Sequence, residues 1–585
     1  MDLTQTGKDI LKQFPLGSNH AVNDYFAVIR RLVAIRNRET DPAAHMLWQQ
    51  SIDDIYEKIH AEMVTNCNPP VTPVHFGTSG WRGILGKDLC IHSVAFVTAA
   101  ILELYTQVEQ RSDFREALGV ADFSEMQQRG CIVGFDNRFG GALLARAVCH
   151  VLAVNKIKIL YAGEATTGIL SAAVLRQRAA FSINLTPSHN PLEYGGLKYN
   201  AADAGPAAPI LTDFITRQAQ KNITAASSCF IPDTINLQAP LSDIPDFTRE
   251  NALVSWQELI RANADVHCLH YDRLLADFST NSNIVIGIDA MHGASRDYIS
   301  PLLNQPDSNR LFILRNRPDV TFGGIAPEPS TDNMQPIMAA LRQRDEQFKI
   351  GAIIDPDGDR IRFTDGSNII SMNQFGAMAY HFLHEIKGKQ GMVAKTVATS
   401  NLANAVAAAL EEPVFEPKVG FKEFKPVLGK ALVFFEESDG ISIIGHTPEK
   451  DAFIGLMLAL DMVLTLKKNL GAYLQEIEQQ FGFFYPQKDG ITVTKKGKDL
   501  KNTLAGLKKY AIGTTIRVGN VDKKISNVIT LDGRKMLFED GSWIMIRPSG
   551  TEPKVRFYVE ARDPEETDSL IKSAQYMLAE IGLVT

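Results

Sequence analysis

Three short apolar segments, each rich in β-branched residues and each ending at an aspartate, constrain the fold most strongly. They span residues 131–136 (CIVGFD), 284–289 (IVIGID) and 350–355 (IGAIID). Apolar runs without alternation, separated by helical patterns, indicate strands that are buried on both faces of parallel sheets. A chain of 585 residues has room for roughly four domains. The recurrence therefore favours three related α/β domains over a single large doubly wound sheet.

The segments outside these strands suggest where the domains begin and end. We predict a helical N-terminal extension at 1–70, which ends at the breaker Asn68-Pro69-Pro70, and a smaller C-terminal α+β domain at 478–585. Between them we place α/β domains at 71–205, 206–335 and 336–477. Residues 205–270 are irregular and read as a connector or insertion.

Composition and charge exclude some classes of partner. Sixty basic and 67 acidic residues give a net charge of −7, which argues against nucleic acid but leaves a small phosphorylated metabolite open. The six cysteines are scattered without a CxxC pair, so neither a disulfide framework nor a cysteine zinc site is indicated. The N-terminus lacks a signal-peptide pattern, and the apolar run 453–466 is too short to span a bilayer. We expect a cytoplasmic protein without a membrane partner.

Asp355, Asp357 and Asp359 follow the third strand at alternate positions. In an extended loop such residues point the same way, so the three carboxylates can converge on one hard cation. An EF-hand is excluded because Arg360 and Gly366 stand at its sixth and twelfth positions. An aspartyl-phosphate phosphatase and a polar capping turn remain alternatives. We favour Mg²⁺ over Ca²⁺ because few protein ligands are offered and a phosphate could complete the shell.

Ser188 lies in the turn Thr186-Pro187-Ser188-His189-Asn190-Pro191. A serine is a weak nucleophile unless a base or a metal activates it. His189 is adjacent, and Lys198 could act as a base if its surroundings lowered its pKa. Taken alone, this segment could equally be a surface turn. Together with the three aspartates it indicates phosphoryl transfer.

Two glycine-containing loops have the composition of phosphate-binding sites. Residues 76–83 (FGTSGWRG) and 547–556 (RPSGTEPKVR) combine glycines, hydroxyls and arginines, which suit close backbone approach and bidentate hydrogen bonds to an anion. Their candidate substrate-binding residues are Thr78, Ser79, Arg82, Arg547, Ser549, Gly550, Thr551 and Arg556. A third candidate loop carries Glu436 and Ser438, which could hold sugar hydroxyls. Lys422, His446 and Lys450 flank it in sequence.

These motifs, in this order over about residues 75–560, resemble the α-D-phosphohexomutase superfamily of phosphoglucomutases and phosphomannomutases. The resemblance implies three related α/β domains and a C-terminal domain with a TATA-binding-protein-like fold around a central cleft. It implies Ser188 as the phosphoserine, with Asp355, Asp357 and Asp359 as Mg²⁺ ligands beside it. Further implied roles are sugar binding by Glu436 and Ser438, phosphate binding by the 547–551 loop, and functional basic side chains at Lys198, Arg360 and Lys422.

The resemblance also implies a reaction. A hexose 1-phosphate and a hexose 6-phosphate would interconvert through a phosphoserine enzyme and a 1,6-bisphosphate, with glucose the first expectation and mannose the second. Glucose 1,6-bisphosphate would then serve as activator and intermediate. Phosphopentomutase or glucose-1,6-bisphosphate synthase activity, a Mg²⁺-dependent phosphatase with Asp355 as nucleophile, and a non-catalytic relative are the alternatives. Two departures, Phe435 before Glu436 and Asp439 where glycine is frequent, concern the sugar loop.

Overall fold

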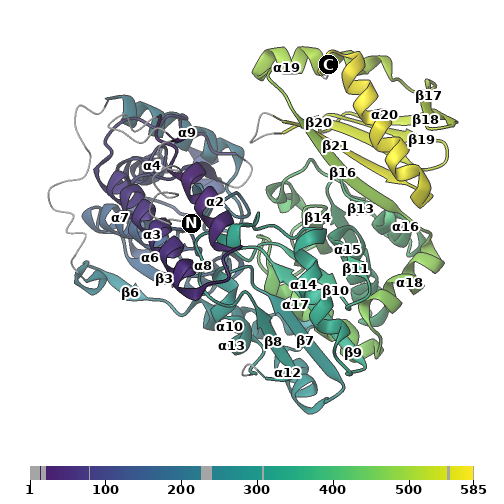
Figure 1. Cartoon of the computed structure of the whole chain (residues 1–585), viewed down its shortest axis with the longest axis horizontal. Coiled ribbons are helices and arrows are strands. Elements are labelled where there is room, and N and C mark those ends of the chain that lie inside the picture. Colours follow the sequence, from purple (N-terminus) through teal and green to yellow (C-terminus); the bar gives the residue numbers. More distant parts are fainter. Residues whose placement is uncertain are drawn as a thin grey trace.

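The computed structural model describes residues 13–14, 22–77, 80–225, 240–305, 308–549 and 554–583. Four sheets follow one another along the chain, and their domains are arranged in an arc (Figure 1). The first domain lies at the left of that view, the second at the bottom, the third to the right and the fourth at the upper right. The sequence prediction of three α/β units followed by a smaller α+β unit is confirmed.

The first sheet has six strands in the order β1-β5-β4-β2-β3-β6. Its strands are β1 (Trp81–Ile84), β2 (Cys131–Phe135), β3 (Ile159–Glu164), β4 (Phe181–Leu185), β5 (Tyr194–Ala201) and β6 (Phe247–Arg249). Its principal helices are α4 (Ile91–Tyr105), α7 (Gly141–Val154), α8 (Thr167–Gln177) and α9 (Pro209–Ala225). Strands β2, β3, β4 and β6 run parallel, and β1 and β5 are antiparallel to their neighbours. Because β2 and β4 are parallel, the loops that follow them emerge side by side.

The second sheet has the order β11-β10-β9-β7-β8. Its strands are β7 (Ile284–Asp289), β8 (Leu311–Leu314), β9 (Phe348–Ile354), β10 (Ile361–Thr364) and β11 (Ile369–Ile370), and its helices include α10 (Ala252–Ala262), α12 (Tyr271–Thr280) and α14 (Thr331–Arg342). Strands β9 and β10 form an antiparallel hairpin, so the loop with the three aspartates belongs to the second sheet. The division drawn from sequence had placed this loop in the third domain. Strand β6 likewise extends the first sheet beyond residue 205, into the segment read as a connector.

The third and fourth sheets complete the arc. The third, β13-β12-β14-β15, contains β12 (Met392–Lys395), β13 (Val414–Phe415), β14 (Ala431–Glu436) and β15 (Gly440–Ile443), with helices α15 (Met372–His381), α16 (Leu402–Ala409), α17 (Ala452–Leu466) and α18 (Leu470–Phe481). The fourth is fully antiparallel: β16 (Tyr485–Thr492), β21 (Lys554–Ala561), β20 (Trp543–Pro548), β19 (Arg534–Phe538), β18 (Val521–Ile529) and β17 (Thr515–Val518). Helices α19 (Gly497–Leu504) and α20 (Thr567–Glu580) accompany it.

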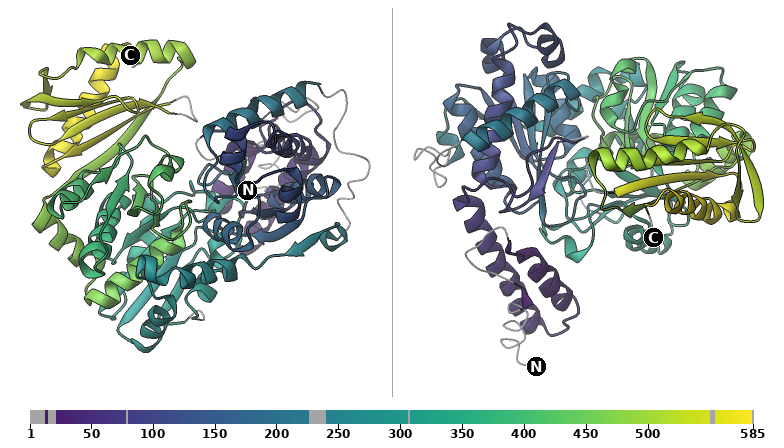
Figure 2. Two further views of the ribbon diagram at one scale, coloured as in Figure 1. Left: turned by 180° about the vertical axis from the view of Figure 1, so that it is seen from behind. Right: turned by 90° about the horizontal axis from the view of Figure 1, so that it is seen from above.

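In the part of the chain that the structure describes, two helices precede the first sheet, α2 (Tyr25–Arg36) and α3 (Pro42–Thr65). Asp41 caps α3 by accepting a hydrogen bond from Ala44 N, and Pro42 occupies the first turn, where it costs no backbone bond. The two helices run side by side and project from the first domain (Figure 2). Their buried apolar residues join the same hydrophobic core as strands β2 to β5. We call this pair the N-terminal hairpin.

The apolar run around residue 460 forms α17, whose apolar residues are almost all buried, as expected for a core helix. Within the described ranges, no helix combines the length and the apolarity needed to cross a bilayer. Cys90, Cys131, Cys149 and Cys268 are free thiols, whereas Cys67 is disulfide-bonded. The scattered spacing of the cysteines had indicated no disulfide.

Candidate active site

Ser188 lies in the loop between β4 and β5, which we call the serine loop (residues 186–193). Its hydroxyl is buried and donates a hydrogen bond to Asp355 Oδ2 at 3.0 Å. Its backbone N–H donates to Thr186 Oγ1 at 2.8 Å, and that hydroxyl donates to Asp136 Oδ2 at 2.6 Å. Asp136 follows β2, whose end lies beside the end of β4. Sequence analysis identified the aspartate at this strand end without assigning it a role.

The Arg138 side chain binds the backbone of the serine loop. Its guanidinium donates to Pro191 O and Ser188 O, both at 2.6 Å, and also to Asn190 O. Burial raises the pKa of Asp136 to about 7, although Arg138 and the Thr186 hydrogen bond oppose the shift. These bonds keep Ser188 at φ +57°, a left-handed conformation that non-glycine residues rarely adopt.

Asp355, Asp357 and Asp359 are all buried, and each offers a carboxylate oxygen within 4.8 Å of the others. Asp355 Oδ1 accepts hydrogen bonds from the backbone N–H groups of Asp359 and Arg360. The left-handed Gly358 permits the tight turn, where a β-carbon would meet the Thr166 side chain at 2.6 Å. Burial and the two neighbouring carboxylates raise the pKa of Asp355 well above its usual range.

Three cations face the aspartates. Lys198 Nζ lies 2.6 Å from Asp357 Oδ2 and 2.8 Å from Asp359 Oδ2, and Lys450 Nζ lies 3.1 Å from Asp359 Oδ2. Arg360 Nε is 3.7 Å from Asp359 Oδ1. Burial alone would raise the pKa of Asp359, but Lys198, Lys450 and Arg360 together lower it well below its usual range. For Lys198, burial lowers the pKa but Asp357 and Asp359 raise it more. The condition under which sequence analysis allowed Lys198 to act as a base, a lowered pKa, is therefore not met by these neighbours.

His189 lies next to Ser188, with Nδ1 3.4 Å from Ser188 Oγ. Burial, followed by the charges of Arg360 and Arg82, lowers the pKa of His189 well below its usual value. The imidazole is therefore neutral at neutral pH, with its Nδ1 directed at the serine hydroxyl.

The aspartates offer a suitable donor set for a hard divalent cation. Among the described groups, Asp357 Oδ1 and Asp359 Oδ1 are buried oxygens without a hydrogen-bond partner. Oxygen-only ligands with few protein donors, beside a position where a phosphate can bind, are typical of Mg²⁺. The three carboxylates fit that ion, and the Ser188 hydroxyl lies at the edge of the same cluster.

A cavity of about 210 Å³ extends from this cluster toward the fourth domain. It brings together nine of the residues predicted from sequence: Arg82, His189, Arg360, Glu436, Ser438, Lys450, Arg547, Ser549 and Arg556. Lys198 and the three aspartates do not line the cavity, and Lys198 forms the ion pairs with Asp357 and Asp359 described above. Thr78, Ser79, Gly550 and Thr551 lie outside the described residues. All four domains thus reach the cavity.

Two predicted substrate-binding residues do not line this cavity, Lys422 and His446. His446 Nε2 lies 2.7 Å from Asp451 Oδ2, and its ring packs edge-on against Trp256 at 5.6 Å. Trp256 Nε1 donates to the same carboxylate at 2.5 Å. The sequence interpretation of His446 is therefore not supported, because its polar edge is turned toward Asp451 at the base of α17.

The sugar-loop departures have structural explanations. Phe435 precedes Glu436 on β14, so its side chain points the opposite way, into the core of the third domain, where Gly376 leaves space for its ring. Asp439 adopts φ +73°, a conformation typical of glycine, and Arg362 binds its carboxylate at 2.7 and 3.1 Å. Glu436 accepts a hydrogen bond from Gly420 N at 2.9 Å. Neither Phe435 nor Asp439 lines the cavity.

Several residues of the site were missed by sequence reasoning. The cavity is also lined by Glu328, Glu437, Glu449, Lys488 and Tyr558. Glu449 is the neighbour of Lys450, which sequence analysis did single out, and Lys488 is a single lysine on a strand, without any local motif. For the Asp136–Thr186 pair and Arg138, the sequence offered one usable signal, the apolar strand that ends at Asp136.

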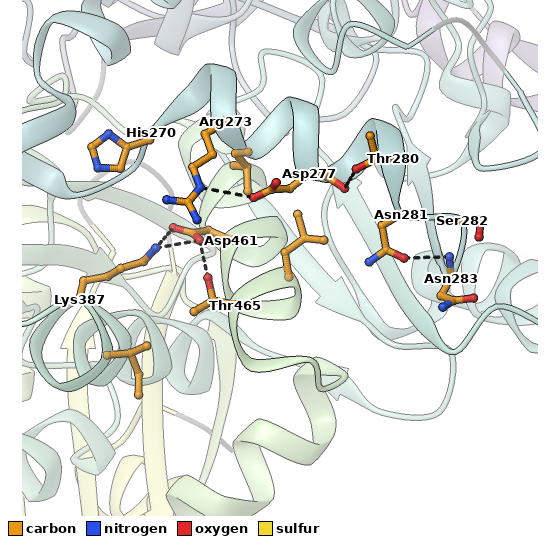
Figure 3. Close-up of a pocket in the computed structure, with 13 residues that line it drawn as sticks. His270, Arg273, Asp277, Thr280, Asn281, Ser282, Asn283, Lys387, Asp461 and Thr465 are labelled. Carbon is orange, nitrogen blue, oxygen red and sulfur yellow. Dashed lines mark hydrogen bonds and ion pairs between the residues drawn. The ribbon is translucent and has the colours of Figure 1, made fainter.

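A larger cavity of about 810 Å³ lies elsewhere, between α12 and α17 (Figure 3). Its charged groups pair with one another: Lys387 with Asp461 at 2.7 Å, and Arg273 with Asp277 at 3.7 Å. It contains none of the residues predicted to be functional. Volume alone is therefore a poor guide to the site in this molecule.

Comparisons with known proteins agree with this geometry. Family models for the phosphoglucomutase/phosphomannomutase α/β/α domains I, II and III match residues 73–226, 267–368 and 371–481, and the model for the C-terminal domain matches 492–574. A phosphoglucomutase of Komagataeibacter xylinus is 26% identical over 83% of this chain and 87% of its own length, and human phosphoglucomutase-1 is 25% identical over 78% and 87%. The crystal structure of the Paramecium phosphoglucomutase pp63/parafusin, in an open form, has a TM-score of 0.65 at 19% identity, covering 88% of this chain and 96% of that one.

Proposed function

The chain belongs to the phosphoglucomutase/phosphomannomutase family and is an intramolecular phosphotransferase, and we propose that it interconverts hexose 1-phosphates and hexose 6-phosphates through a phosphorylated Ser188. The observation that supports this most directly is the 3.0 Å hydrogen bond from Ser188 Oγ to Asp355 Oδ2. It joins the Ser188 hydroxyl of the serine loop to the carboxylate cluster of a different domain. A phosphoryl group carried on Ser188 would lie at that cluster.

The reaction consists of two transfers in opposite directions. In the first, the 6-hydroxyl of a hexose 1-phosphate attacks the phosphorus of phosphoserine 188, the bond from phosphorus to Oγ breaks, and the hydroxyl proton is released. The resulting 1,6-bisphosphate turns within the cavity. In the second, Ser188 Oγ loses its proton and attacks the phosphorus of the phosphate at C1. The bond from that phosphorus to the C1 oxygen breaks and the C1 oxygen takes up a proton, which leaves a hexose 6-phosphate and a phosphorylated enzyme. Atoms and charge balance over the cycle, so besides moving a proton the protein supplies mainly positioning and charge neutralisation.

The residues around Ser188 have separable roles in this scheme. Neutral His189 is placed to take the proton of the attacking hydroxyl and to return it. Lys198, Lys450 and Arg360 offset the negative charge of the aspartates. Asp355, Asp357 and Asp359 would hold Mg²⁺, which when bound supplies positive charge beside the transferring phosphoryl group.

The far end of the cavity would hold the phosphate that is not reacting. Arg547, Ser549 and Arg556 line it from the fourth domain, and Arg547 is oriented by Asp532 at 2.9 Å. Glu436 and Ser438 lie between the two ends and would bind sugar hydroxyls. A clamp remote from Ser188 lets either phosphate be held while the other reacts. We propose glucose phosphates as the preferred substrates, mannose phosphates as the second choice, glucose 1,6-bisphosphate as the activator, and the cytoplasm as the location.

The proposal is tested by following conversion of glucose 1-phosphate to glucose 6-phosphate with Mg²⁺ and a trace of glucose 1,6-bisphosphate. Mannose 1-phosphate and ribose 1-phosphate are run in parallel. We expect turnover with glucose that is lost in Ser188→Ala and retained in the matched control Ser367→Ala, a serine in a turn outside the cavity. Turnover that survives in Ser188→Ala, or none with any of the three sugars, would contradict the proposal.

A further inference from the structure

The N-terminal hairpin lies outside the matched family domains, the first of which begins at residue 73. It nevertheless packs against the segment that follows β2, whose Arg138 binds the serine loop. The Tyr56 ring of α3 lies 4.5 Å from the Phe139 ring, centroid to centroid. Two turns further along α3, Met63 occupies the space beside Gly140, where a β-carbon would meet its methyl at 2.4 Å. The hairpin therefore contacts the segment that contains Arg138.

Arg138 connects this contact to Ser188. It immediately precedes Phe139, and its guanidinium donates to the carbonyls of Ser188 and Pro191 at 2.6 Å. On its other side it lies over the Phe322 ring, 4.6 Å from the centroid. A shift of Phe139 would move Arg138 and so release two carbonyls of a loop that holds Ser188 at a positive φ. Phe139 and Arg138 thus connect the ring of Tyr56 to the backbone of Ser188.

A second contact reaches the other end of the serine loop. Arg30 of α2 forms an ion pair with Glu193 at 3.0 Å, and Glu193 is the last residue before β5. The second carboxylate oxygen of Glu193 is buried and has no hydrogen-bond partner among the described groups. Loss of Arg30 would leave a largely buried carboxylate without its counter-ion, which favours movement of the loop toward solvent.

The hairpin also joins the first domain to the second. Asn37 Nδ2 donates to Gly323 O at 2.7 Å, and Val33 packs against Gly324. Phe322, the residue that lies against Arg138, is fully buried in the same hydrophobic core as the hairpin. The two helices therefore support Arg138 from both sides, through Phe139 and through Phe322.

We propose that the N-terminal hairpin is a positioning element for phosphoryl transfer, which holds the serine loop in its left-handed conformation through Tyr56–Phe139–Arg138 and through Arg30–Glu193. The expected effect of the hairpin on kinetics rests on the proposed function. Its expected effect on the conformation of the loop rests on the geometry alone. Tyr56 and Arg30 are positioning residues, since neither lines the cavity.

Two matched pairs of variants test it in the full-length chain. The Tyr56 hydroxyl has no hydrogen-bond partner among the described groups, so Tyr56→Phe keeps every contact that matters while Tyr56→Ala removes the ring. Arg30→Ala removes the ion pair, and Arg31→Ala changes the next residue of the helix, which is exposed. For each variant one measures amide hydrogen exchange of the 186–194 peptide, kcat and KM for glucose 1-phosphate, and the rate at which glucose 1,6-bisphosphate phosphorylates Ser188.

We expect Tyr56→Ala to speed exchange of the serine loop and to lower kcat and the phosphorylation rate at least tenfold, with KM within twofold of wild type. Arg30→Ala should show the same pattern at roughly threefold, and Tyr56→Phe and Arg31→Ala should match wild type. Unchanged exchange at the loop in both Tyr56→Ala and Arg30→Ala would overturn the inference, as would equal losses in Tyr56→Phe. A wild-type chain without mutase activity would refute the proposed function instead, and the exchange data would still decide the role of the hairpin.

Discussion

Ser188 combines two features that a single residue rarely has, a buried hydroxyl and a left-handed backbone. For an L-residue this conformation costs on the order of 1 kcal/mol, because the β-carbon crowds the following carbonyl oxygen. The hydrogen bonds from Ser188 N to Thr186 and from Arg138 to Ser188 O offset that cost. The result is a hydroxyl directed at Asp355 before any substrate binds.

Asp439 supplies a test of backbone strain at the sugar loop. Replacing it removes the ion pair with Arg362, whichever residue is introduced. Glycine adopts φ +73° without strain, whereas alanine does not. We expect Asp439→Ala to be less stable than Asp439→Gly by about 1 kcal/mol, measured as the difference in unfolding free energy in urea. Equal stability of the two variants would show that the loop relaxes and that Asp439 is not held in this conformation.

The sequence was informative at the residue scale wherever several chemical signals coincided in one short segment. Asp355, Asp357, Asp359 and Ser188 were predicted to act together, and the structure brings them into one cluster. His446 was assigned to the substrate because it flanks the Glu436–Ser438 loop in sequence. Its ring instead completes a buried network with Trp256, almost 200 positions away, which local sequence cannot reveal.

At the scale of elements, β16 connects the third domain to the fourth and forms one wall of the cavity. Lys488 lines the cavity from this strand and forms no ion pair or hydrogen bond with the described residues, unlike Lys198 and Lys450. An unpaired ammonium facing a cavity for phosphorylated sugars is available to bind the ligand. No motif marks it, because a single lysine on an exposed strand is common.

Lys488→Met should therefore weaken ligand binding without changing the serine loop. We expect KM for glucose 1-phosphate to rise about fivefold, and more free glucose 1,6-bisphosphate to appear in solution per turnover, since the turning bisphosphate loses one counter-ion. Lys495→Met, on the neighbouring exposed segment, is the control. A KM equal to that of wild type, with no released bisphosphate, would show that Lys488 does not contact the ligand.

Lys535 on β19 lies at the interface between the third and fourth domains. It is buried, donates to Val397 O at 2.9 Å and lies 4.0 Å from the Trp543 ring centroid. Burial, followed by repulsion from Lys395, lowers the pKa of Lys535 to about 7. Between about pH 7 and pH 10 the unfolded lysine binds more protons than the folded one, so the stability of the folded state rises with pH through this window.

We accordingly expect wild type to gain stability relative to Lys535→Met as pH rises from 7 to 9, by on the order of 2 kcal/mol. Amide hydrogen exchange of peptides from β19 and β20, compared between the two proteins at each pH, reports this difference locally. The exposed Lys524→Met on β18 serves as the control. A stability difference that does not change with pH would mean that Lys535 titrates normally.

At the scale of the whole molecule, the arc of four domains divides the chemistry between distant segments. The first domain carries Ser188, the second carries the aspartates, the third contributes Glu436, and the fourth contributes Arg547 and Arg556. One phosphoryl-transfer centre and one remote clamp allow a sugar with two phosphates to present either end. The domain count followed from chain length and from the recurring strands. The position of the boundary between the second and third domains, near residue 370, could not be predicted in this way, because it depends on the pairing of β9 with β10.

The clamp can be separated from the transfer centre by mutation. Arg556→Ala should raise KM for glucose 1-phosphate and for glucose 6-phosphate by a similar factor, at least tenfold, because the clamp holds whichever phosphate is idle. Arg562→Ala, further along the same segment and absent from the cavity, is the matched control. An increase confined to one of the two substrates would contradict a shared clamp.

The central claim is that Ser188 carries the phosphoryl group, and the chemical identity of the phosphoenzyme tests it most directly. The full-length chain is incubated with glucose 1,6-bisphosphate and Mg²⁺, quenched in acid and analysed by peptide mass spectrometry, with Ser188→Ala and Asp355→Asn in parallel. We predict an acid-stable phosphate on Ser188, absent from Ser188→Ala. A hydroxylamine-sensitive phosphate on Asp355 that persists in Ser188→Ala and disappears in Asp355→Asn would contradict the account and assign the chain an aspartyl-phosphate mechanism.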